Sequence, residues 1–521
     1  MVPPTRRFPT AALAAAVALA TAACSGSSAI TTRGPAGDPV LGGTARVIMY
    51  SEPRSVDPAA MSNAWAFNAV LGNALYGTLM ANDVQTGRID YKMAESFTSD
   101  DNGRTFALTL RENLAFTDGG PLDAQAVKFN WDRLRNPATA SSSIREAALI
   151  ASTEVVDART LKVTLRMPVP NYAHALVNGG MNWIASPKAL AKGQRAFDAA
   201  PVGAGPFILK SWSRNDKFEL VKNPRYWDPP KPYLDRIVLR ATPDSMQRLS
   251  SLTSGGVDVS IDTSWKTIDK ARKAGFPTQV MPLSGGQGVV MNTRRPPFDD
   301  LRARQAVAAA LDLDAANLSV YNGKGKRADR LFERSSPFYT DIRLARQDRQ
   351  LAQRLLDQLA GEGKRLSFTF SAQATSEAKG LSESLQTQLS AFRNVEVKIK
   401  TIDSADTSRI YAARDFDMVI SSTMMVDPEP QLWANYHGRS TANMSGLNDP
   451  RLNAALDKGR LSTSLDERKA AYTVAQERLA ALVPQIPVTR TAPAVETAGN
   501  VHGARMYGLG SLMPEELWMN R

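Results

Sequence analysis

Strand-like and helix-like segments alternate along this chain, and no other feature constrains its fold as strongly. Short runs rich in β-branched and aromatic residues are typical of strands, and they occupy residues 45–50, 105–111, 161–167, 207–212, 217–221, 236–240, 395–400 and 416–421. Apolar residues at helical spacing fill the intervals, as Leu381, Leu385 and Leu389 do after Ser376. This alternation predicts an α/β architecture.

Two of the predicted helices begin with residues that cap helix N-termini. Asp449 followed by Pro450 places a capping carboxylate before a first-turn proline. Ser464 and Glu467 have the spacing of a capping box, and Pro484 is expected to end the helix that they begin. These signals predict where the helices start and add detail to the α/β assignment.

The length and charge of the chain limit the classes of protein to which it can belong. Its 521 residues, 43% hydrophobic and 22% charged, indicate a globular chain that is too long for one core, so we expect two or three compact units. The net charge of +12 is spread along the chain, and the densest basic stretch, residues 327–354, also carries acidic residues. This pattern indicates a solvated face and no nucleic-acid partner.

The N-terminal segment has the organisation of an export signal. Arg6 and Arg7 precede an apolar run at residues 11–20, which is too short to span a bilayer comfortably. Small residues then lead into Cys24, an arrangement that resembles a bacterial lipobox with Thr21 in place of the usual leucine. The pattern predicts that Cys24 is lipidated and becomes the first residue of the mature protein.

The export signal defines the first two segments of the chain. We expect a signal peptide at residues 1–23 and a lipidated, flexible tether at residues 24–43, where Ser, Gly, Thr and Pro are frequent. A plain signal peptide with an incidental cysteine is the alternative. Cys24 is the single cysteine, so the body of the protein has neither a disulfide framework nor a cysteine metal site.

Residues that enzymes use in local catalytic motifs are scarce. The histidines are His174, His437 and His502, and the chain contains no HExxH, GxSxG, P-loop or CxxC motif. We therefore expect no enzyme activity, no catalytic residues, no cofactor and no metal site. An exported hydrolase that uses a carboxylate pair is the alternative class, because any large protein offers many carboxylates.

A series of short motifs follows a fixed order along the chain, at residues 55–58, 93–97, 101–106, 116–122, 201–207, 223–227 and 297–306. Examples are Ser-Val-Asp-Pro in the first, Pro-Val-Gly-Ala-Gly-Pro-Phe in the fifth and Asn-Pro-Arg-Tyr-Trp in the sixth. Together the motifs resemble family 5 of the ABC-transporter solute-binding proteins, the peptide- and nickel-binding class that includes oligopeptide- and dipeptide-binding lipoproteins. The resemblance covers nearly all of the chain after the N-terminal segment.

The resemblance implies a two-lobed, periplasmic-binding-protein-like α/β fold (type II, cluster C) with an extra inserted domain. Lobe I would contain a discontinuous domain at residues 44–76, 184–283 and 490–521, together with the inserted domain at residues 77–183. Lobe II would be residues 284–489.

The same resemblance implies a function in transport. The protein would capture a small ligand, a peptide or peptide-like molecule, in an interlobe cleft and deliver it to an ABC permease with a cytoplasmic ATPase. It would be a monomer held by its lipid anchor on the extracytoplasmic face of the bacterial cell membrane, in the periplasm or the cell-wall space. A lipoprotein that keeps the fold for a sensing or structural role is the alternative.

Candidate ligand-binding residues come from segments that line the cleft in that family, chiefly loops near the expected crossings between the lobes. They are Ser62, Asn63, Ala64, Trp65, Trp183, Gly285, Gly286, Gln287, Ser422, Thr423, Met424, Met425, Asp427 and Arg490. An ordinary loop or packing role is the alternative for each. Arg490 could pair with a ligand carboxylate or with a neighbouring acidic residue.

The segment at residues 416–430 resembles the part of peptide-binding members in which an aspartate holds the ligand's α-ammonium group. In an ungapped alignment Val426 takes the place of that aspartate, and Asp427 follows one residue later. Either Asp427 fills the role through a one-residue shift, or the ligand has no free ammonium group there. Neighbouring side chains of an extended segment point to opposite sides, which favours the second hypothesis.

Lipidation at Cys24 gives a testable prediction. Replacing Cys24 by Ser should release the protein from the membrane fraction, because the acyl chains on the cysteine supply its hydrophobic contact with the bilayer. Incorporation of labelled lipid and membrane fractionation measure the two effects. Equal membrane retention of the native chain and the Cys24→Ser variant would contradict the anchor.

Overall fold

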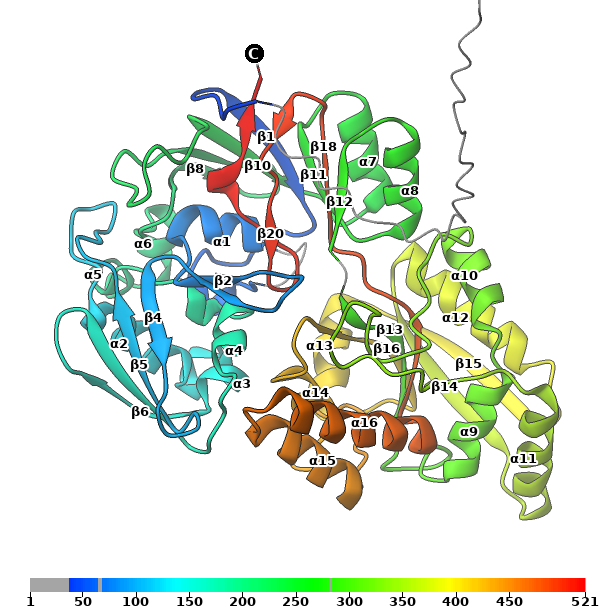
Figure 1. Ribbon diagram of the computed structural model, residues 1–521. Helices are drawn as coiled ribbons and strands as arrows, with labels where there is room; N and C mark the ends of the chain where they lie inside the picture. Colours follow the sequence, from blue (N-terminus) through cyan, green and yellow to red (C-terminus); the bar gives the residue numbers. More distant parts are fainter. Residues whose placement is uncertain (1–36, 64–67, 282, 521) are drawn as a thin grey trace, which may run out of the picture. The chain divides into compact units, whose positions relative to one another are not determined.

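Three β-sheets of four or more strands organise the computed structural model, which describes residues 37–63, 68–281 and 283–520 (Figure 1). The largest has seven strands in the order β12-β18-β11-β1-β10-β9-β8, and β1 is parallel to its neighbours β10 and β11. Its strands are β1 (Thr44–Met49), β8 (Phe207–Ser213), β9 (Lys217–Lys222), β10 (Arg236–Ala241), β11 (Val259–Asp262), β12 (Thr278–Val280) and β18 (Ala494–Thr497). The sheet thus joins strands from the beginning, middle and end of the chain.

The second sheet is antiparallel and has the order β4-β5-β7-β6. Its strands are β4 (Ala94–Thr98), β5 (Thr105–Leu110), β6 (Ile150–Val155) and β7 (Thr160–Leu165). Its core includes packed aromatic rings: those of Phe97 and Phe106 stack with centroids 4.5 Å apart, and Trp131 of α2 (Ala124–Leu134) meets Phe97 edge-on. Such offset-stacked and edge-to-face contacts add to the stabilisation that burial of these rings provides.

The third sheet has five strands in the order β15-β14-β16-β13-β17. Its strands are β13 (Ser284–Met291), β14 (Leu366–Gln373), β15 (Val395–Ile402), β16 (Met418–Met425) and β17 (Gln485–Thr489). β16 pairs antiparallel with β13 over eight residues and parallel with β14. β16 is therefore an inner strand, and its backbone is held on both sides.

Helices lie next to these sheets and supply most of the remaining core. Near the seven-stranded sheet they are α1 (Ala69–Tyr76), α5 (Pro187–Leu190), α6 (Gln194–Ala199), α7 (Ser245–Thr253) and α8 (Trp265–Lys273). Near the four-stranded sheet they are α2 (Ala124–Leu134), α3 (Ile144–Ala147) and α4 (Ala173–Val177). Those that follow β13 in the chain are α9 (Leu301–Ala310), α10 (Leu313–Tyr321), α11 (Arg349–Gly361), α12 (Ser376–Leu389), α13 (Ser404–Ala413), α14 (Gln431–Tyr436), α15 (Pro450–Leu461) and α16 (Leu465–Leu482).

Six short strands complete the list of strands. They form pairs that are antiparallel: β2 with β3, β19 with β22, and β20 with β21. Their bounds are β2 (Met80–Asn82), β3 (Ile89–Tyr91), β19 (Val501–His502), β20 (Met506–Tyr507), β21 (Ser511–Leu512) and β22 (Trp518–Met519). Within the described residues, none of the helices combines the length and the apolar character that crossing a membrane requires.

Each of the three larger sheets is built from strands of one of the domains that the family resemblance implies. All seven strands of the first sheet fall within residues 44–76, 184–283 and 490–521, the four-stranded sheet falls within residues 77–183, and the five-stranded sheet falls within residues 284–489. We therefore propose those segments as the domain boundaries of the protein. Their contacts join residues Pro39–Arg521 in one compact unit.

The helix caps agree with the sequence in most respects. Asp449 caps α15 and Pro450 is its first residue, as predicted. Ser464 caps α16 by accepting a hydrogen bond from the backbone N–H of Glu467. The second half of the capping box is absent, because the Glu467 carboxylate accepts from the hydroxyl of Ser462 instead.

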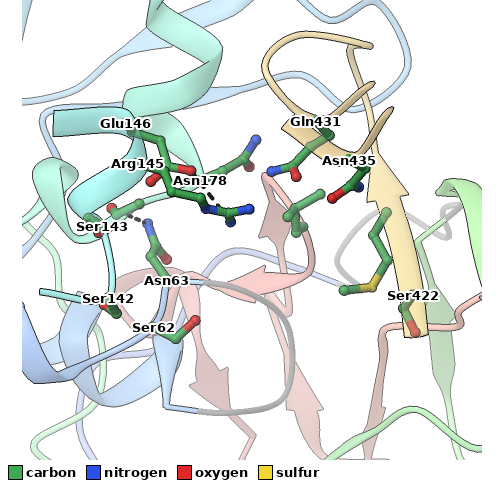
Figure 2. A pocket seen from close by; sticks show the side chains of 13 residues that line it. Ser62, Asn63, Ser142, Ser143, Arg145, Glu146, Asn178, Ser422, Gln431 and Asn435 are labelled. Carbon is green, nitrogen blue, oxygen red and sulfur yellow. Dashed lines mark hydrogen bonds and ion pairs between the residues drawn. The ribbon is translucent and has the colours of Figure 1, made fainter. Parts of the chain in front are cut away.

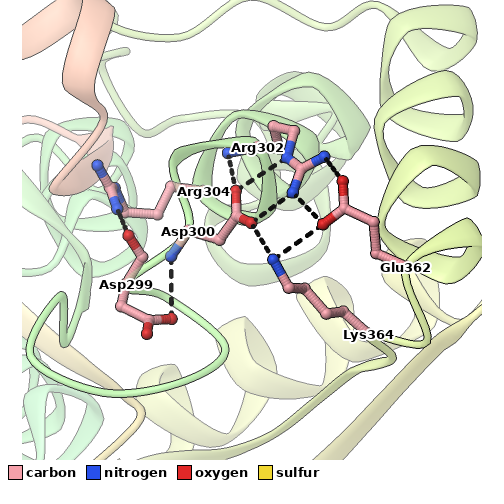
Figure 3. A network of polar contacts seen from close by, with 6 residues as sticks. All are labelled: Asp299, Asp300, Arg302, Arg304, Glu362 and Lys364. Atoms are coloured by element: carbon pink, nitrogen blue, oxygen red, sulfur yellow. Dashed lines mark hydrogen bonds and ion pairs between the residues drawn. The ribbon is translucent and has the colours of Figure 1, made fainter.

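A network of charged side chains fixes the start of α9 (Figure 3). Asp300 caps the helix through the backbone N–H of Arg302, and the guanidinium of Arg302 also donates to Glu362 at the end of α11. Lys364 contacts Asp300 at 3.3 Å and Glu362 at 2.9 Å. The hydrogen bonds from Arg302 and Lys364 lower the pKa of Glu362 to about 2, so the network stays charged at neutral pH.

The glycine-rich segment at residues 201–207 packs closely against α1. A Cβ atom on Gly205 would lie 2.4 Å from the carbonyl oxygen of Ala74, and one on Gly203 would lie 2.2 Å from that of Leu75. These distances are too short for any side chain. Glycine is therefore required here for close contact between the loop and the helix backbone.

This contact predicts the effect of adding one methyl group. Gly205→Ala should lower the free energy of unfolding by about 1–3 kcal/mol, because the helix backbone must move to make room. Gly361→Ala is the matched control: that glycine ends α11 with nothing within 4 Å of its Cβ position, so stability should stay the same or rise slightly. Urea denaturation measures both, and an equal response of the two variants would contradict the proposed contact.

Candidate functional site

A polar cavity of about 210 Å³ is the candidate ligand site (Figure 2). Its volume lies below the roughly 300–1,000 Å³ of typical ligand pockets, so it suits a small molecule. Its lining consists of Ser62, Asn63, Ser142, Ser143, Arg145, Glu146, Asn178, Gly179, Ser422, Met424, Gln431, Asn435 and Leu509. Hydroxyl and amide groups dominate this lining, so a ligand can be held mainly by hydrogen bonds.

The first wall is fixed by a buried hydrogen-bond network around Asn63, which is 1% exposed. Its amide nitrogen donates to the carbonyl of Val177 at 3.0 Å and to the hydroxyl of Tyr507 at 3.1 Å. Its amide oxygen accepts from the hydroxyl of Ser511 at 2.7 Å. Asn63 therefore shapes the wall and ties it to the C-terminal segment, while its own polar groups are satisfied within the protein.

Strand β16 supplies part of the second wall through the alternation of its side chains. Successive residues of a strand point to opposite faces, so Ser422 and Met424 line the cavity and Thr423 and Met425 do not. Thr423 is buried, with its hydroxyl 3.2 Å from that of Tyr436, and Met425 lies in an apolar core. The pairing of β16 with β13 thus sets which side chains can reach a ligand.

Helix α14 supplies two amides to the same wall. Gln431 and Asn435 are four residues apart and therefore share one face of the helix. The amide nitrogen of Asn435 donates to Thr423 at 3.2 Å, which orients the side chain. Within the described residues, the side chains of Ser422 and Gln431 make no hydrogen bond, so both are available to a ligand.

Two charged residues line the cavity, and both come from α3. Figure 2 shows the guanidinium of Arg145 reaching into the cavity beside Glu146. The side chain of Arg145 is 47% exposed and that of Glu146 is 11% exposed, and the closest nitrogen and oxygen of the two are 3.7 Å apart. Within the parts of the chain that the structure describes, no group of three His, Cys, Asp or Glu side chains is arranged to hold a metal ion.

Asp427 lies just after β16, but it is bound by an arginine of the protein. Its carboxylate accepts hydrogen bonds from the guanidinium of Arg468 on α16 at 2.6 Å and from the backbone N–H of Glu429 at 2.9 Å. Burial opposes the charged form of Asp427, but His174, Arg468 and these hydrogen bonds outweigh burial and lower its pKa. Asp427 is therefore ionised and already paired.

Glu429 forms a second buried ion pair with Arg460 of α15, and both side chains are almost inaccessible. Burial raises the pKa of Glu429, while the neighbouring guanidinium acts in the opposite direction. Val426, between the two acids and β16, joins an apolar cluster with Met424 and Leu509. The acidic residues that follow β16 are thus neutralised by arginines and offer no free charge to the cavity.

The structure brings four of the predicted ligand-binding residues to the cavity: Ser62, Asn63, Ser422 and Met424. Their ligand contacts stay predictions. Ala64 and Trp65 lie outside the described residues, as does Cys24.

Two predicted residues, Trp183 and Arg490, are placed in the protein interior instead. Trp183 is fully buried, and its indole N–H donates to the side chain of Asn73 at 2.9 Å. Arg490 forms an ion pair with Glu333 at 2.7 Å and donates to the carbonyl of Leu331 at 2.9 Å. The sequence left two partners open for Arg490, a ligand carboxylate and a neighbouring acidic residue. The structure shows a neighbouring acidic residue, Glu333, as its partner.

Gly285, which was expected in a loop near a crossing between the lobes, lies in a strand, and this is a correction. Gly285, Gly286 and Gln287 belong to β13, and a Cβ on Gly285 would lie 2.0 Å from the carbonyl oxygen of Thr423. Gly285 also has a φ of +83°, a conformation that favours glycine, and the missing side chain lets β13 approach β16 closely. The amide of Gln287 accepts from the hydroxyl of Tyr321 at 3.1 Å, and none of the three lines the cavity.

Most residues that line the polar cavity were not predicted from the sequence. The missed residues are Ser142, Ser143, Arg145, Glu146, Asn178, Gly179, Gln431, Asn435 and Leu509. The spacing of Gln431 and Asn435, just beyond the Asp427 segment, is a signal that could have indicated an amide-bearing helix face. The residues around Arg145 carry no such signal, because tertiary packing alone brings them to the cavity.

Removing Arg468 should destabilise the fold, because the carboxylate of Asp427 would then be buried without a partner. Arg468→Met keeps much of the side-chain volume, and the free energy of unfolding should fall by about 3–5 kcal/mol at pH 7. Arg439→Met removes one partner of the exposed pair with Asp457 and should cost less than about 1 kcal/mol. Urea denaturation compares the two.

The pH dependence of this effect follows from the lowered pKa of Asp427. The ionised carboxylate stabilises the fold above its pKa in the unfolded chain, about 3.9, and this contribution is lost as the pH falls through the folded-state pKa. The stability difference between the native chain and Arg468→Met should therefore shrink below about pH 4. A difference that does not change with pH would contradict the assignment.

Comparison with known proteins identifies relatives for most of the chain. The family model for bacterial extracellular solute-binding proteins, family 5 Middle, matches residues 88–443. The glutathione-binding protein GsiB of Escherichia coli (strain K12) is 32% identical over 224 residues, which make up 43% of this chain and 44% of that protein. The alignment thus spans less than half the length of this curated relative.

Solved structures match over a larger part of the chain. DppA of Helicobacter pylori, in complex with the peptide STSA, gives a TM-score of 0.81 at 22% identity and covers 92% of this chain and 99% of that one. The dipeptide-binding protein of Pseudoalteromonas sp. SM9913, in complex with Met-Leu, gives a TM-score of 0.80 at 22% identity. The match covers 92% of this chain and 100% of that one. These matches confirm the predicted two-lobed α/β fold of periplasmic binding proteins. The chain belongs to the bacterial extracellular solute-binding proteins of family 5.

Proposed function

We propose that this protein is an extracytoplasmic binding protein of an ABC importer and that it captures a small peptide or peptide-like molecule in the polar cavity. The observation that carries the proposal is the cavity itself, with its hydroxyl, amide and charged lining. Ser422 and Gln431 line the cavity and have no hydrogen-bond partner within the described residues. A ligand that enters the cavity can satisfy these donors and acceptors.

The relatives support a peptide-like ligand. The curated relatives are glutathione-binding proteins by name, and the solved structures hold a dipeptide and a short peptide. The compared proteins are solute-binding proteins rather than enzymes, which supports a binding role without catalysis. The small volume of the cavity limits the ligand, or the part of it that enters the cavity, to a few residues.

The remaining parts of the proposal concern delivery and location. We propose that the protein works as a monomer, that lipidated Cys24 holds it on the outer face of the cell membrane, and that it delivers its ligand to a permease driven by a cytoplasmic ATPase. Closure of the two proposed lobes around the ligand would exclude water and strengthen the polar contacts in the cavity.

Blocking the cavity gives the direct test. Gln431→Trp places a bulky ring at the first residue of α14, inside the lining, and should abolish ligand binding with little effect on the fold. Gln194→Trp is the matched control, because Gln194 is an exposed first residue of a helix of equal length, α6. The probes are reduced glutathione, a library of di- and tripeptides, and any small molecule that mass spectrometry finds in the purified protein.

Thermal unfolding measures the outcome. A ligand at 100 times its Kd should stabilise the native chain and Gln194→Trp by about 2.7 kcal/mol and leave Gln431→Trp unchanged. Equal stabilisation of both variants would place the binding site elsewhere. If no probe stabilises the native chain and no small molecule is retained, the proposed transport function is wrong.

A further inference from the structure

The cavity contains one positive and one negative side chain, which form an ion pair with each other but no hydrogen bond. The guanidinium of Arg145 and the carboxylate of Glu146 approach to 3.7 Å, which is longer than a hydrogen bond. Within the described residues neither group makes any side-chain hydrogen bond. Both belong to the cavity lining, so their unused hydrogen-bonding capacity faces the space that a ligand would occupy.

The other charged groups nearby are not available. Asp427 is paired with Arg468 and Glu429 with Arg460, in both cases away from solvent. A positive group on a ligand therefore has Glu146 as its anionic partner among the lining residues, and a negative group has Arg145 as its cationic partner.

Polar atoms around the pair match a ligand that carries both charges. The carboxylate of Glu146 makes no hydrogen bond within the described residues, and it can accept from an ammonium group. The amide of Gln431 and the hydroxyl of Ser422 are also without partners within the described residues and can donate to a carboxylate. Donors and acceptors for both halves of a zwitterion are thus present in one small cavity.

The separation of the two protein charges limits the separation of the ligand charges. Because the closest charged atoms of Arg145 and Glu146 are 3.7 Å apart, a ligand whose two charges lie close together can contact both side chains at once. The ends of an extended dipeptide are separated by roughly 7 Å, at about 3.5 Å per residue. An ammonium and a carboxylate on the same carbon atom are much closer and suit the pair better.

We propose that Arg145 and Glu146 recognise an α-amino-acid head group, in which an ammonium and a carboxylate are attached to one carbon. Free amino acids and γ-linked glutamyl peptides carry such a group, whereas ordinary α-linked peptides have the two charges at opposite ends. Arg145 binds the carboxylate, and Glu146 binds the ammonium. This inference rests on the proposed function, and it names the class of ligand for the same cavity.

Two isomeric ligands test the inference. γ-Glutamylglycine and α-glutamylglycine have the same formula and net charge, but the first has the head group on one carbon and the second does not. Calorimetry at pH 7 should show that the native chain binds the γ isomer at least about tenfold more tightly. Acetylation of the γ isomer on its amino group should weaken binding by about 30-fold or more, because the buried Glu146 then loses its partner.

Protein variants complete the test. Glu146→Gln and Arg145→Gln should each weaken binding of the γ isomer by about 30-fold or more. In Glu146→Gln the difference between the free and acetylated ligands should also disappear, because the contact with the ammonium is already lost. Glu154→Gln and Arg195→Gln are controls at exposed positions outside the cavity and should bind as the native chain does. Thermal unfolding without ligand checks that all four variants fold.

The outcomes separate this inference from the proposed function. If the acetylated or α-linked ligand binds as tightly as the γ isomer, or if Glu146→Gln binds normally, the head-group inference is wrong and the capture of peptides still stands. If neither isomer binds the native chain at millimolar concentration, the head-group inference is also wrong. The cavity-blocking experiment with Gln431→Trp then decides independently whether the cavity binds any ligand.

Discussion

The high cost of burying an unpaired charge determines how this cavity is organised. Asp427 and Glu429 follow β16 directly, and each is held in the interior by an arginine, Arg468 and Arg460 respectively. Removing a buried charge from water is offset only when a partner and additional hydrogen bonds replace the water. Because α15 and α16 supply those partners, the acids serve to join the two helices to the end of β16, and their charge does not act on the ligand.

This pairing leaves the chemistry of the cavity to other residues. β16 is an inner strand, so its alternation directs Ser422 and Met424 to the cavity and Thr423 and Met425 to the interior. On the other wall, Asn63 connects the segment before α1 to the C-terminal segment through buried hydrogen bonds. Side chains on such well-supported segments lose little conformational freedom when a ligand binds, which favours affinity.

Local sequence patterns predict the elements of this fold better than its site. The eight strand-like runs are all strands, because alternation and β-branched residues act within each segment. Ser284–Met291 is a strand although its glycines are typical of a loop, because those glycines allow close contact with the distant strands β16 and β17. The packing of α3 brings Arg145 and Glu146 to the cavity, and Arg490 forms an ion pair with Glu333 instead of facing the cavity. Local sequence patterns predict neither placement, because both depend on contacts between distant segments.

The proposed function depends most on where the ligand binds. A crystal structure of the protein with the molecule that stabilises it most strongly is the direct measurement. We predict ligand density in the polar cavity, with a carboxylate against Arg145, an ammonium against Glu146, and hydrogen bonds to Ser422 or Gln431. Density at another place, with the cavity occupied by water, would contradict the account.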